Sequence, residues 1–158
     1  MDRIINLIGG IGQYSVSHDY VKYMLDEIGA GPVTVKCTSM GGDLNEAIMI
    51  KALFEQRGDI TLEYVGFNAS AATILGHGAV KTLIREDSMY LVHKPSLMVD
   101  VFERMDEDDL TELLSELEGQ KKDAEKITVM IAQDYVNSRG LEMSKVIQLM
   151  TDARWLTG

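Results

Sequence analysis

Strand-like and helix-like segments alternate along the chain from Arg3 to Val92, and glycines stand at most of the boundaries. The strand-like segments are short and apolar, as buried strands are, and they predict strands over residues 3–8, 33–37, 60–67 and 89–92. The segments between them place apolar residues at helical spacing. They predict helices that begin at Ser17 or His18, after Gly41-Gly42-Asp43, and over residues 69–76. This alternation predicts βαβ units, so the expected fold class is α/β with a mostly parallel sheet.

The composition changes after Pro95. Residues 100–125 hold most of the acidic excess, and leucines 110, 113, 114 and 117 recur there at helical spacing. A second helical stretch follows, and together they predict a long helical hairpin, a handle over about residues 100–139. Residues of about 1–98 and 140–158 would form the head of the same single domain. The leucine stripe predicts packing against the core or against a partner subunit.

Composition and charge exclude several classes of function. Of the 158 residues 46% are hydrophobic, which suits a soluble single domain, and no apolar run is long enough to span a bilayer. The formal net charge of −10 argues against nonspecific nucleic-acid binding. There is no phosphate-binding loop and no disulfide framework, and Cys37 lies in an apolar run that predicts a buried, unreactive thiol. The N-terminus lacks the features of a signal peptide, so we expect a cytoplasmic protein.

Ser70 and His93 each follow a predicted strand, and they are the candidate catalytic residues. A serine hydroxyl needs an adjacent general base to act as a nucleophile. If the two strands are parallel neighbours, their carboxyl ends lie at the same edge of the sheet and bring the two residues together. Taken alone, Ser70 can also be interpreted as a small residue or a helix cap at the start of the predicted helix. Asn68-Ala-Ser-Ala-Ala72 does not match the G-x-S-x-G pattern of a nucleophile elbow.

Three motifs and the end of the chain resemble the Clp protease proteolytic subunit family. The motifs are Thr38-Ser-Met-Gly-Gly-Asp43, Gly66-Phe-Asn-Ala-Ser-Ala-Ala72 and Tyr90-Leu-Val-His-Lys-Pro95, and the chain closes with Arg154-Trp-Leu-Thr157. The resemblance covers nearly the whole chain and is nearest to the Clp-like proteases of phages and prophages. Met40 stands where these proteins typically have proline, and Asn68 stands where they have alanine.

The resemblance implies both a fold and a mechanism. The fold is the spiral of βαβ units with a protruding helical handle, which belongs to the ClpP/crotonase-like class. Ser70 corresponds to the nucleophile and His93 to the general base of a serine endopeptidase. Gly41 and Ala71, with Gly42 in support, correspond to the backbone donors of the oxyanion hole. Such donors suit this chemistry because peptide hydrolysis passes through a tetrahedral oxyanion. No cofactor or metal is implied.

The triad acid is the point at which this chain departs most from the family. Asp152 is the nearest carboxylate before the closing aromatic motif and is assigned as the acid, while Asp134 is a more distant candidate. Loss of the acid can lower the rate by about 10⁴, so one alternative is a catalytically inactive subunit that still forms a ring. A second alternative is a crotonase-like acyl-coenzyme A enzyme, which leaves the pairing of Ser70 with His93 unexplained.

The resemblance also implies partners. It predicts a protein or peptide substrate, enclosed in a homo-oligomeric ring that is a heptamer or double heptamer. A phage origin would place the protein in the host cytoplasm, with a role in head maturation. Partnership with an AAA+ unfoldase stays open, because little of the chain precedes the first strand. The chain stops at Gly158, where the family continues, so we expect a truncated C-terminus.

Overall fold

The computed structural model describes residues 3–158 and divides into two compact units. One unit contains the chain up to His93 together with Leu149–Gly158, and the other contains Lys94–Gln148. The first unit carries the sheet and all residues assigned to the candidate site. The expectation of a single domain with a head and a handle stays a prediction.

The first unit is built on a six-stranded sheet of order β1-β2-β3-β5-β6, in which β4 also pairs with β3. The strands are β1 (Ile4–Ile8), β2 (Val33–Ser39), β3 (Ile60–Ala69), β4 (Lys81–Ile84), β5 (Met89–Leu91) and β6 (Trp155–Thr157). Among these described strands every pair is parallel except β5 with β6. The predicted α/β class with a mostly parallel sheet is therefore confirmed.

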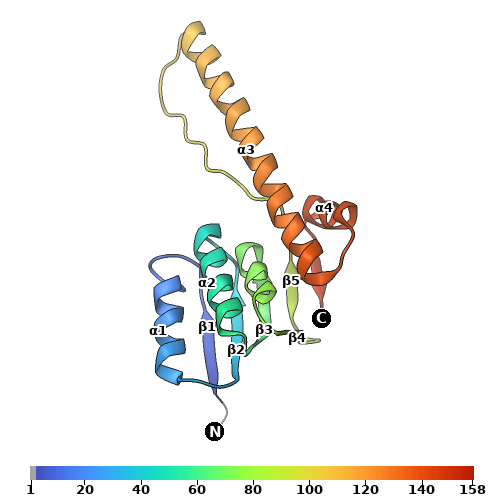
Figure 1. The fold of residues 1–158 in the computed structure, drawn as a ribbon. Helices are drawn as coiled ribbons and strands as arrows, with labels where there is room; N and C mark the ends of the chain where they lie inside the picture. Colours follow the sequence, from blue (N-terminus) through green and yellow to red (C-terminus); the bar gives the residue numbers. More distant parts are fainter. Residues whose placement is uncertain (1–2) are drawn as a thin grey trace. The chain divides into compact units, whose positions relative to one another are not determined.

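Three helices lie on one face of this sheet, in front of the strands in Figure 1. They are α1 (His18–Ile28), α2 (Leu44–Arg57) and the 3₁₀ helix η1 (Ser70–His77). The first two begin where the sequence predicts. The Ser17 hydroxyl accepts the N–H of Tyr20 at 3.2 Å, and the Asp43 carboxylate accepts the N–H of Glu46 at 3.0 Å. Such caps satisfy amide groups that a helix start leaves without partners.

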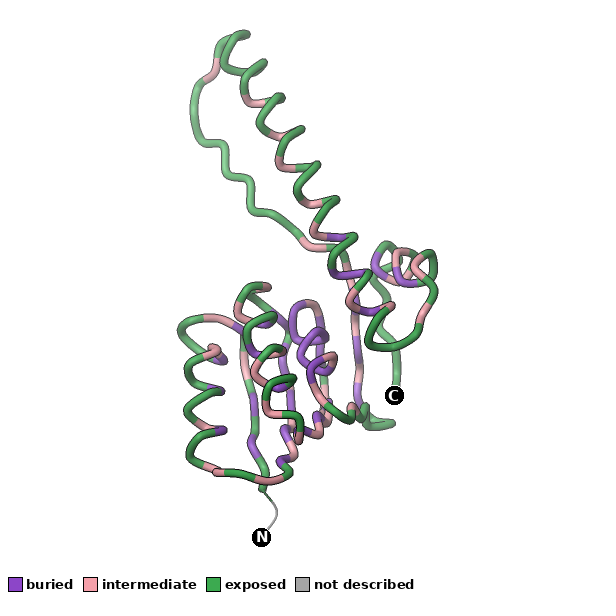
Figure 2. Tube along the Cα trace, viewed as in Figure 1, coloured by how far each residue is buried: buried purple, intermediate pink, exposed green. Residues whose placement is uncertain are grey.

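The hydrophobic core occupies the face of the sheet beneath these helices, where buried segments of β2, β3 and η1 are purple in Figure 2. Leu7, Val35 and Leu62 are each fully buried at 0% exposure, and side chains of this size contribute roughly 1.5–3 kcal/mol each when buried. Residues that alternate with them face the other side, where Lys36 and Glu63 form an ion pair at 3.8 Å. The core therefore holds β2 and β3 in place up to the ends that carry the candidate site.

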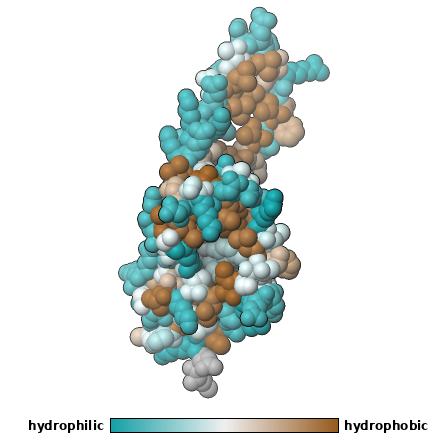
Figure 3. Space-filling view, turned by 90° about the vertical axis from the view of Figure 1, so that its right-hand side faces the viewer, coloured by the Kyte–Doolittle hydropathy of each residue, from teal (hydrophilic) through white to brown (hydrophobic). Residues whose placement is uncertain are grey.

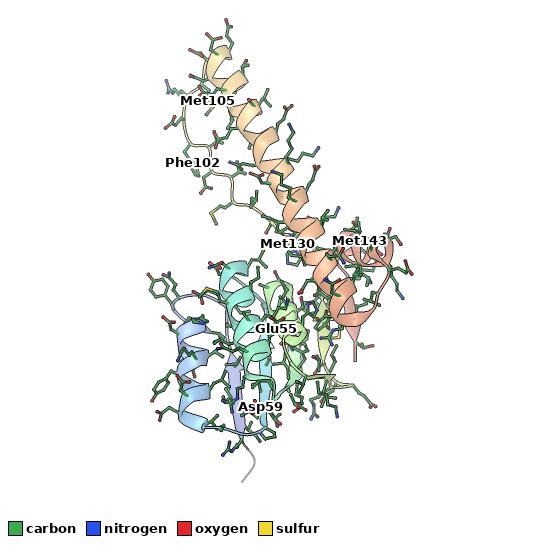
Figure 4. The ribbon with its side chains drawn as sticks, in the orientation of Figure 1. Glu55, Asp59, Phe102, Met105, Met130 and Met143 are labelled. Carbon is green, nitrogen blue, oxygen red and sulfur yellow. The ribbon has the colours of Figure 1, made fainter. Side chains whose placement is uncertain are left out.

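The second unit consists of an irregular segment, one long helix and the start of another helix. Residues 94–106 form no regular secondary structure, and Phe102 and Met105 lie on this segment (Figure 4). The helix α3 (Glu107–Arg139) follows without a break, and α4 (Met143–Asp152) begins in this unit and ends in the first. The predicted helical hairpin is wrong, because residues 107–139 contain most of both expected arms and form one continuous helix with no turn between them. Asp106 explains where α3 starts, because it forms a capping box with Asp109.

Apolar side chains are exposed along much of this second unit. Phe102 is 93% exposed and Leu114 is 64% exposed. Figure 3 shows hydrophobic residues in brown on the surface that it draws. The buried side chains of α3 are confined to its C-terminal part, from Thr128 to Tyr135. None of the helices in the described part of the chain is both long and apolar enough to cross a membrane.

Candidate active site

Ser70 occupies a strained turn between a strand and a helix. It follows the last residue of β3 and is the first residue of η1. Its φ is +59°, whereas the preceding Ala69 is extended at φ −145°. Residues other than glycine rarely adopt a positive φ, and such strain clusters at functional sites. A sharp turn of this kind also describes the nucleophile elbow of hydrolases. The geometry is therefore present although the sequence lacks the elbow pattern.

A glycine turn lies directly against this serine. Gly41 has φ +93°, and a methyl group added to it would come within 2.6 Å of the Ser70 Cβ and 3.0 Å of the Ala71 nitrogen. Real Cβ atoms do not approach other atoms so closely, so only glycine fits between the two turns. The structure thus brings together Gly41, Ser70 and Ala71, which the sequence analysis assigned to one site.

Hydrogen bonds fix the orientation of the peptide groups in the Gly41-Gly42 turn. The Gly41 carbonyl accepts the N–H of Ile11 at 2.9 Å, and the Ile11 carbonyl accepts the N–H of Asp43 at 2.9 Å. In a planar trans peptide the N–H points opposite to the carbonyl, so the N–H of Gly42 points away from Ile11. The N–H of Gly41 donates to the Ser39 hydroxyl at 3.2 Å. The Gly42 N–H is therefore directed away from Ile11, whereas the Gly41 N–H is already bonded to the Ser39 hydroxyl.

His93 lies at the same edge of the sheet as Ser70. The strands β3 and β5 are parallel neighbours, and Ala69 pairs with Leu91. Ser70 follows Ala69 directly, and His93 comes two residues after Leu91. Neighbouring strands are about 4.8 Å apart, so the strand ends bring both residues to one small region. The predicted adjacency of the two strands is confirmed, and the catalytic roles of the two residues stay predictions.

The assigned acid lies across β5 from the serine strand. Asp152 is the exposed last residue of α4, just before Ala153 at φ +46° and strand β6. β6 runs antiparallel to β5, with Trp155 paired to Leu91. That pair is the last between the two strands; His93 lies two residues after Leu91 in the chain, and Asp152 lies three residues before Trp155. Asp134, the other candidate, belongs to α3 in the second unit.

One buried amide beside the site was noted in the sequence only as a departure from the family. Asn68 is 0% exposed, and its side-chain oxygen accepts the backbone N–H of Ser39 at 3.1 Å. Its amide nitrogen donates to the carbonyl of Val65 at 3.1 Å. The signal in the sequence is a polar side chain at a strand end among apolar and small residues. Its hydrogen-bond partners lie on two strands, so sequence alone does not reveal them.

Cys37 is a poor candidate for nucleophilic chemistry. It is 0% exposed on β2, and burial raises the pKa of its thiol to about 12. The thiolate is the reactive form of cysteine, so the expectation of a buried and unreactive thiol is confirmed. The described residues also contain no cluster of side chains that could hold a metal ion.

Comparison with known proteins places this geometry within a known fold. The structure is similar to a point mutant of ClpP1 from Listeria monocytogenes, with a TM-score of 0.75. The chain has a Clp protease-like fold. The match covers 98% of this chain and 82% of ClpP1, at 19% sequence identity. At that identity the likeness concerns the fold. No protein-family model matches the chain, and no curated protein matches it.

Proposed function

We propose that the protein is a serine hydrolase that cleaves peptide bonds through an acyl-enzyme. The observation that carries the proposal is the contact between two strained turns, in which Gly41 lies against Ser70 and the Ala71 nitrogen. This arrangement puts a hydroxyl nucleophile beside backbone amides that can stabilise an oxyanion. The Clp protease-like fold is consistent with this chemistry.

In the proposed reaction His93 carries the proton in every step. The Ser70 hydroxyl attacks the peptide carbonyl and passes its proton to His93, while the amides of Ala71 and the Gly41-Gly42 turn bind the oxyanion. His93 then protonates the departing amine, which leaves Ser70 esterified. Water attacks the ester and gives a proton to His93, which passes it to the Ser70 oxygen as the carboxylic acid leaves. In this proposal Asp152 orients the imidazole, as the acid of a triad does.

Assembly of several copies is a further part of the proposal. It is supported by apolar side chains that the second unit exposes, including Leu110 at 49% and Leu114 at 64%. A self-associated ring would cover such surface and enclose the substrate. Light scattering across a range of protein concentrations measures the molar mass. A monomer at every concentration would contradict this part of the proposal and leave the chemistry at Ser70 untouched.

A fluorophosphonate probe tests the chemistry most directly, because it reacts with activated serines whatever the natural substrate is. We expect intact mass to show one added probe per chain, absent in Ser70→Ala and retained in Ser115→Ala. Ser115 is a matched control, since it is an exposed serine of α3. Labelling that persists in Ser70→Ala would contradict the proposal.

A second candidate is an inactive subunit of the same fold. It is favoured by the exposure of Asp152 at the end of α4, because the acid of a catalytic triad is buried beside its histidine. A folded, assembled protein that the probe does not label would support this candidate over the hydrolase.

A further inference from the structure

We propose that Asn68 is a positioning residue that sets the Gly41-Gly42 turn against Ser70, acting through Ser39. This inference rests on the proposed function, because it gives the turn a role in binding the oxyanion. Asn68 lies two residues before the serine on β3 and reaches across to the end of β2. One side chain therefore connects the strand of the nucleophile with the turn that carries the oxyanion donors.

The position of Asn68 follows from an irregularity in the sheet. Cys37 pairs with Tyr64, but the next pair joins Ser39 to Asn68, so β3 contains extra residues between the pairs. The regular ladder is interrupted there, and buried backbone groups need other partners. The Val65 carbonyl accepts the Asn68 amide at 3.1 Å and the Thr38 hydroxyl at 2.7 Å. The amide nitrogen of Asn68 thus binds within the irregular part of β3, at the Val65 carbonyl.

The other end of the Asn68 amide leads to the glycine turn. Its oxygen accepts the N–H of Ser39 at 3.1 Å, and the Ser39 hydroxyl accepts the N–H of Gly41 at 3.2 Å. Ser39 is only 3% exposed, so water does not easily replace these bonds. The hydrogen bonds form a continuous connection from the Val65 carbonyl through Asn68 and Ser39 to Gly41.

This connection matters because the two turns have no spare room. A displacement of Gly41 toward Ser70 is blocked by the close approach of the two backbones. A displacement away from it opens the space where the oxyanion would bind. Errors of about 1 Å in the placement of reacting groups can lower rates by about 100-fold. The Asn68 connection opposes displacement in this second direction.

Asn68→Ala and Thr38→Val form a matched pair of variants. Both remove a hydrogen bond to the Val65 carbonyl, but only Asn68→Ala also removes the acceptor of the Ser39 N–H. We expect Asn68→Ala to lower the rate of labelling by the fluorophosphonate about 10- to 100-fold, and Thr38→Val to lower it less than about twofold. Thermal unfolding of both variants measures their stability, so that a general loss of structure is recognised.

Ser39→Ala tests whether Asn68 acts through Ser39. This variant keeps the Asn68 bond to Val65 and removes the hydroxyl that accepts the Gly41 N–H. We expect it also to slow labelling, and the double variant with Asn68→Ala to be no slower than the slower single variant, because both act through one connection. Independent, multiplied effects would overturn the proposal. If Asn68→Ala fails to fold, Ser39→Ala labelled at the wild-type rate would overturn it as well.

Hydrogen exchange separates this inference from the proposed function, since it needs no catalytic activity. Mass spectrometry of the peptide that contains residues 38–43 reports the order of the turn. We expect about tenfold faster exchange there in Asn68→Ala than in Thr38→Val at equal thermal stability. Equal exchange in the two variants would overturn the positioning role. A wild-type protein that is never labelled would contradict the proposed function alone, and the exchange result would still decide the role of Asn68.

Discussion

The junction at Ser70 and the long helix α3 each contain a glycine, but the space around the two glycines differs. At the junction, Gly41 has a positive φ and lies against the backbone of another strand end, so no side chain fits. In α3, Gly119 has nothing within 4 Å of the position where a methyl group would be added. The junction therefore depends on the close approach of two backbone segments, whereas most of α3 depends on local helix formation. Paired substitutions in the two regions test this difference.

We expect the largest contrast between Gly41→Ala and Gly119→Ala. The methyl group at position 41 would lie 2.6 Å from the Ser70 Cβ, and we expect fluorophosphonate labelling to fall by about 10²- to 10³-fold, as when an oxyanion donor is lost. Gly119→Ala should stabilise α3 by about 0.5–1 kcal/mol, because glycine weakens helix interiors. Labelling kinetics and thermal melting followed by circular dichroism measure these effects. If Gly41→Ala is labelled as fast as Gly119→Ala, the turn has room for a methyl group at position 41.

Leu75→Ala and Leu114→Ala compare a buried leucine of η1 with an exposed leucine of α3. Leu75 is 0% exposed, so its truncation should destabilise the first unit by about 2–5 kcal/mol through lost burial and a cavity. Leu114 is 64% exposed, and its truncation should change the stability of the isolated chain by less than about 0.5 kcal/mol. Urea unfolding at a concentration where the protein is monomeric measures both. A large loss for Leu114→Ala would mean that this surface is covered.

A hydroxyl comparison should give a smaller contrast. The Tyr64 hydroxyl donates toward the carbonyls of Ala72 and Thr73 and accepts the N–H of Gly76, within the core. Tyr64→Phe removes the acceptor of the Gly76 N–H and a donor to the Ala72 carbonyl, while the Thr73 carbonyl keeps the Tyr90 hydroxyl at 3.1 Å. The substitution should destabilise the protein by about 1–3 kcal/mol.

The matched control for this hydroxyl is Thr128→Val in α3. The Thr128 hydroxyl only donates to the carbonyl of Ala124 within the same helix. We expect a change below about 0.5 kcal/mol by the same unfolding measurement. If Tyr64→Phe is as mild as Thr128→Val, η1 does not need the hydroxyl for its position.

The smallest effect should come from a surface ion pair. Hydrogen bonding to Arg85 lowers the pKa of the Asp87 carboxyl below its ordinary value. The ionised form is favoured in the folded state, so the contribution is present above the unfolded pKa and disappears as pH falls through the folded pKa. We expect Asp87→Asn to remove a weak acid dependence of stability below about pH 4. Titration of Asp87 by NMR with an unshifted pKa would contradict this expectation.

Sequence alone determined the parts of the protein that depend on neighbours along the chain. The alternating apolar runs predicted β1, β2 and β3, and Ser17 and Asp43 marked two helix starts, because pleating and capping are local effects. The order of these elements then predicted a parallel sheet with the ends of β3 and β5 side by side. The family resemblance pointed to Ser70, His93 and the glycine turn. The helical spacing of the leucines indicated helix correctly, but the hairpin inferred from it is one continuous helix, α3.

Tertiary structure decided what depends on partners distant in the sequence. The strands β4 and β6 are short and largely exposed, so pairing with β3 and β5 defines them and no alternating pattern announces them. The positive φ of Ser70 arises where a strand end meets a helix start and has no signature in its neighbours. Asn68 likewise acquires its bonds only after β2 and β3 pair out of regular register. Local sequence specifies the elements, and their packing specifies which atoms meet at the site.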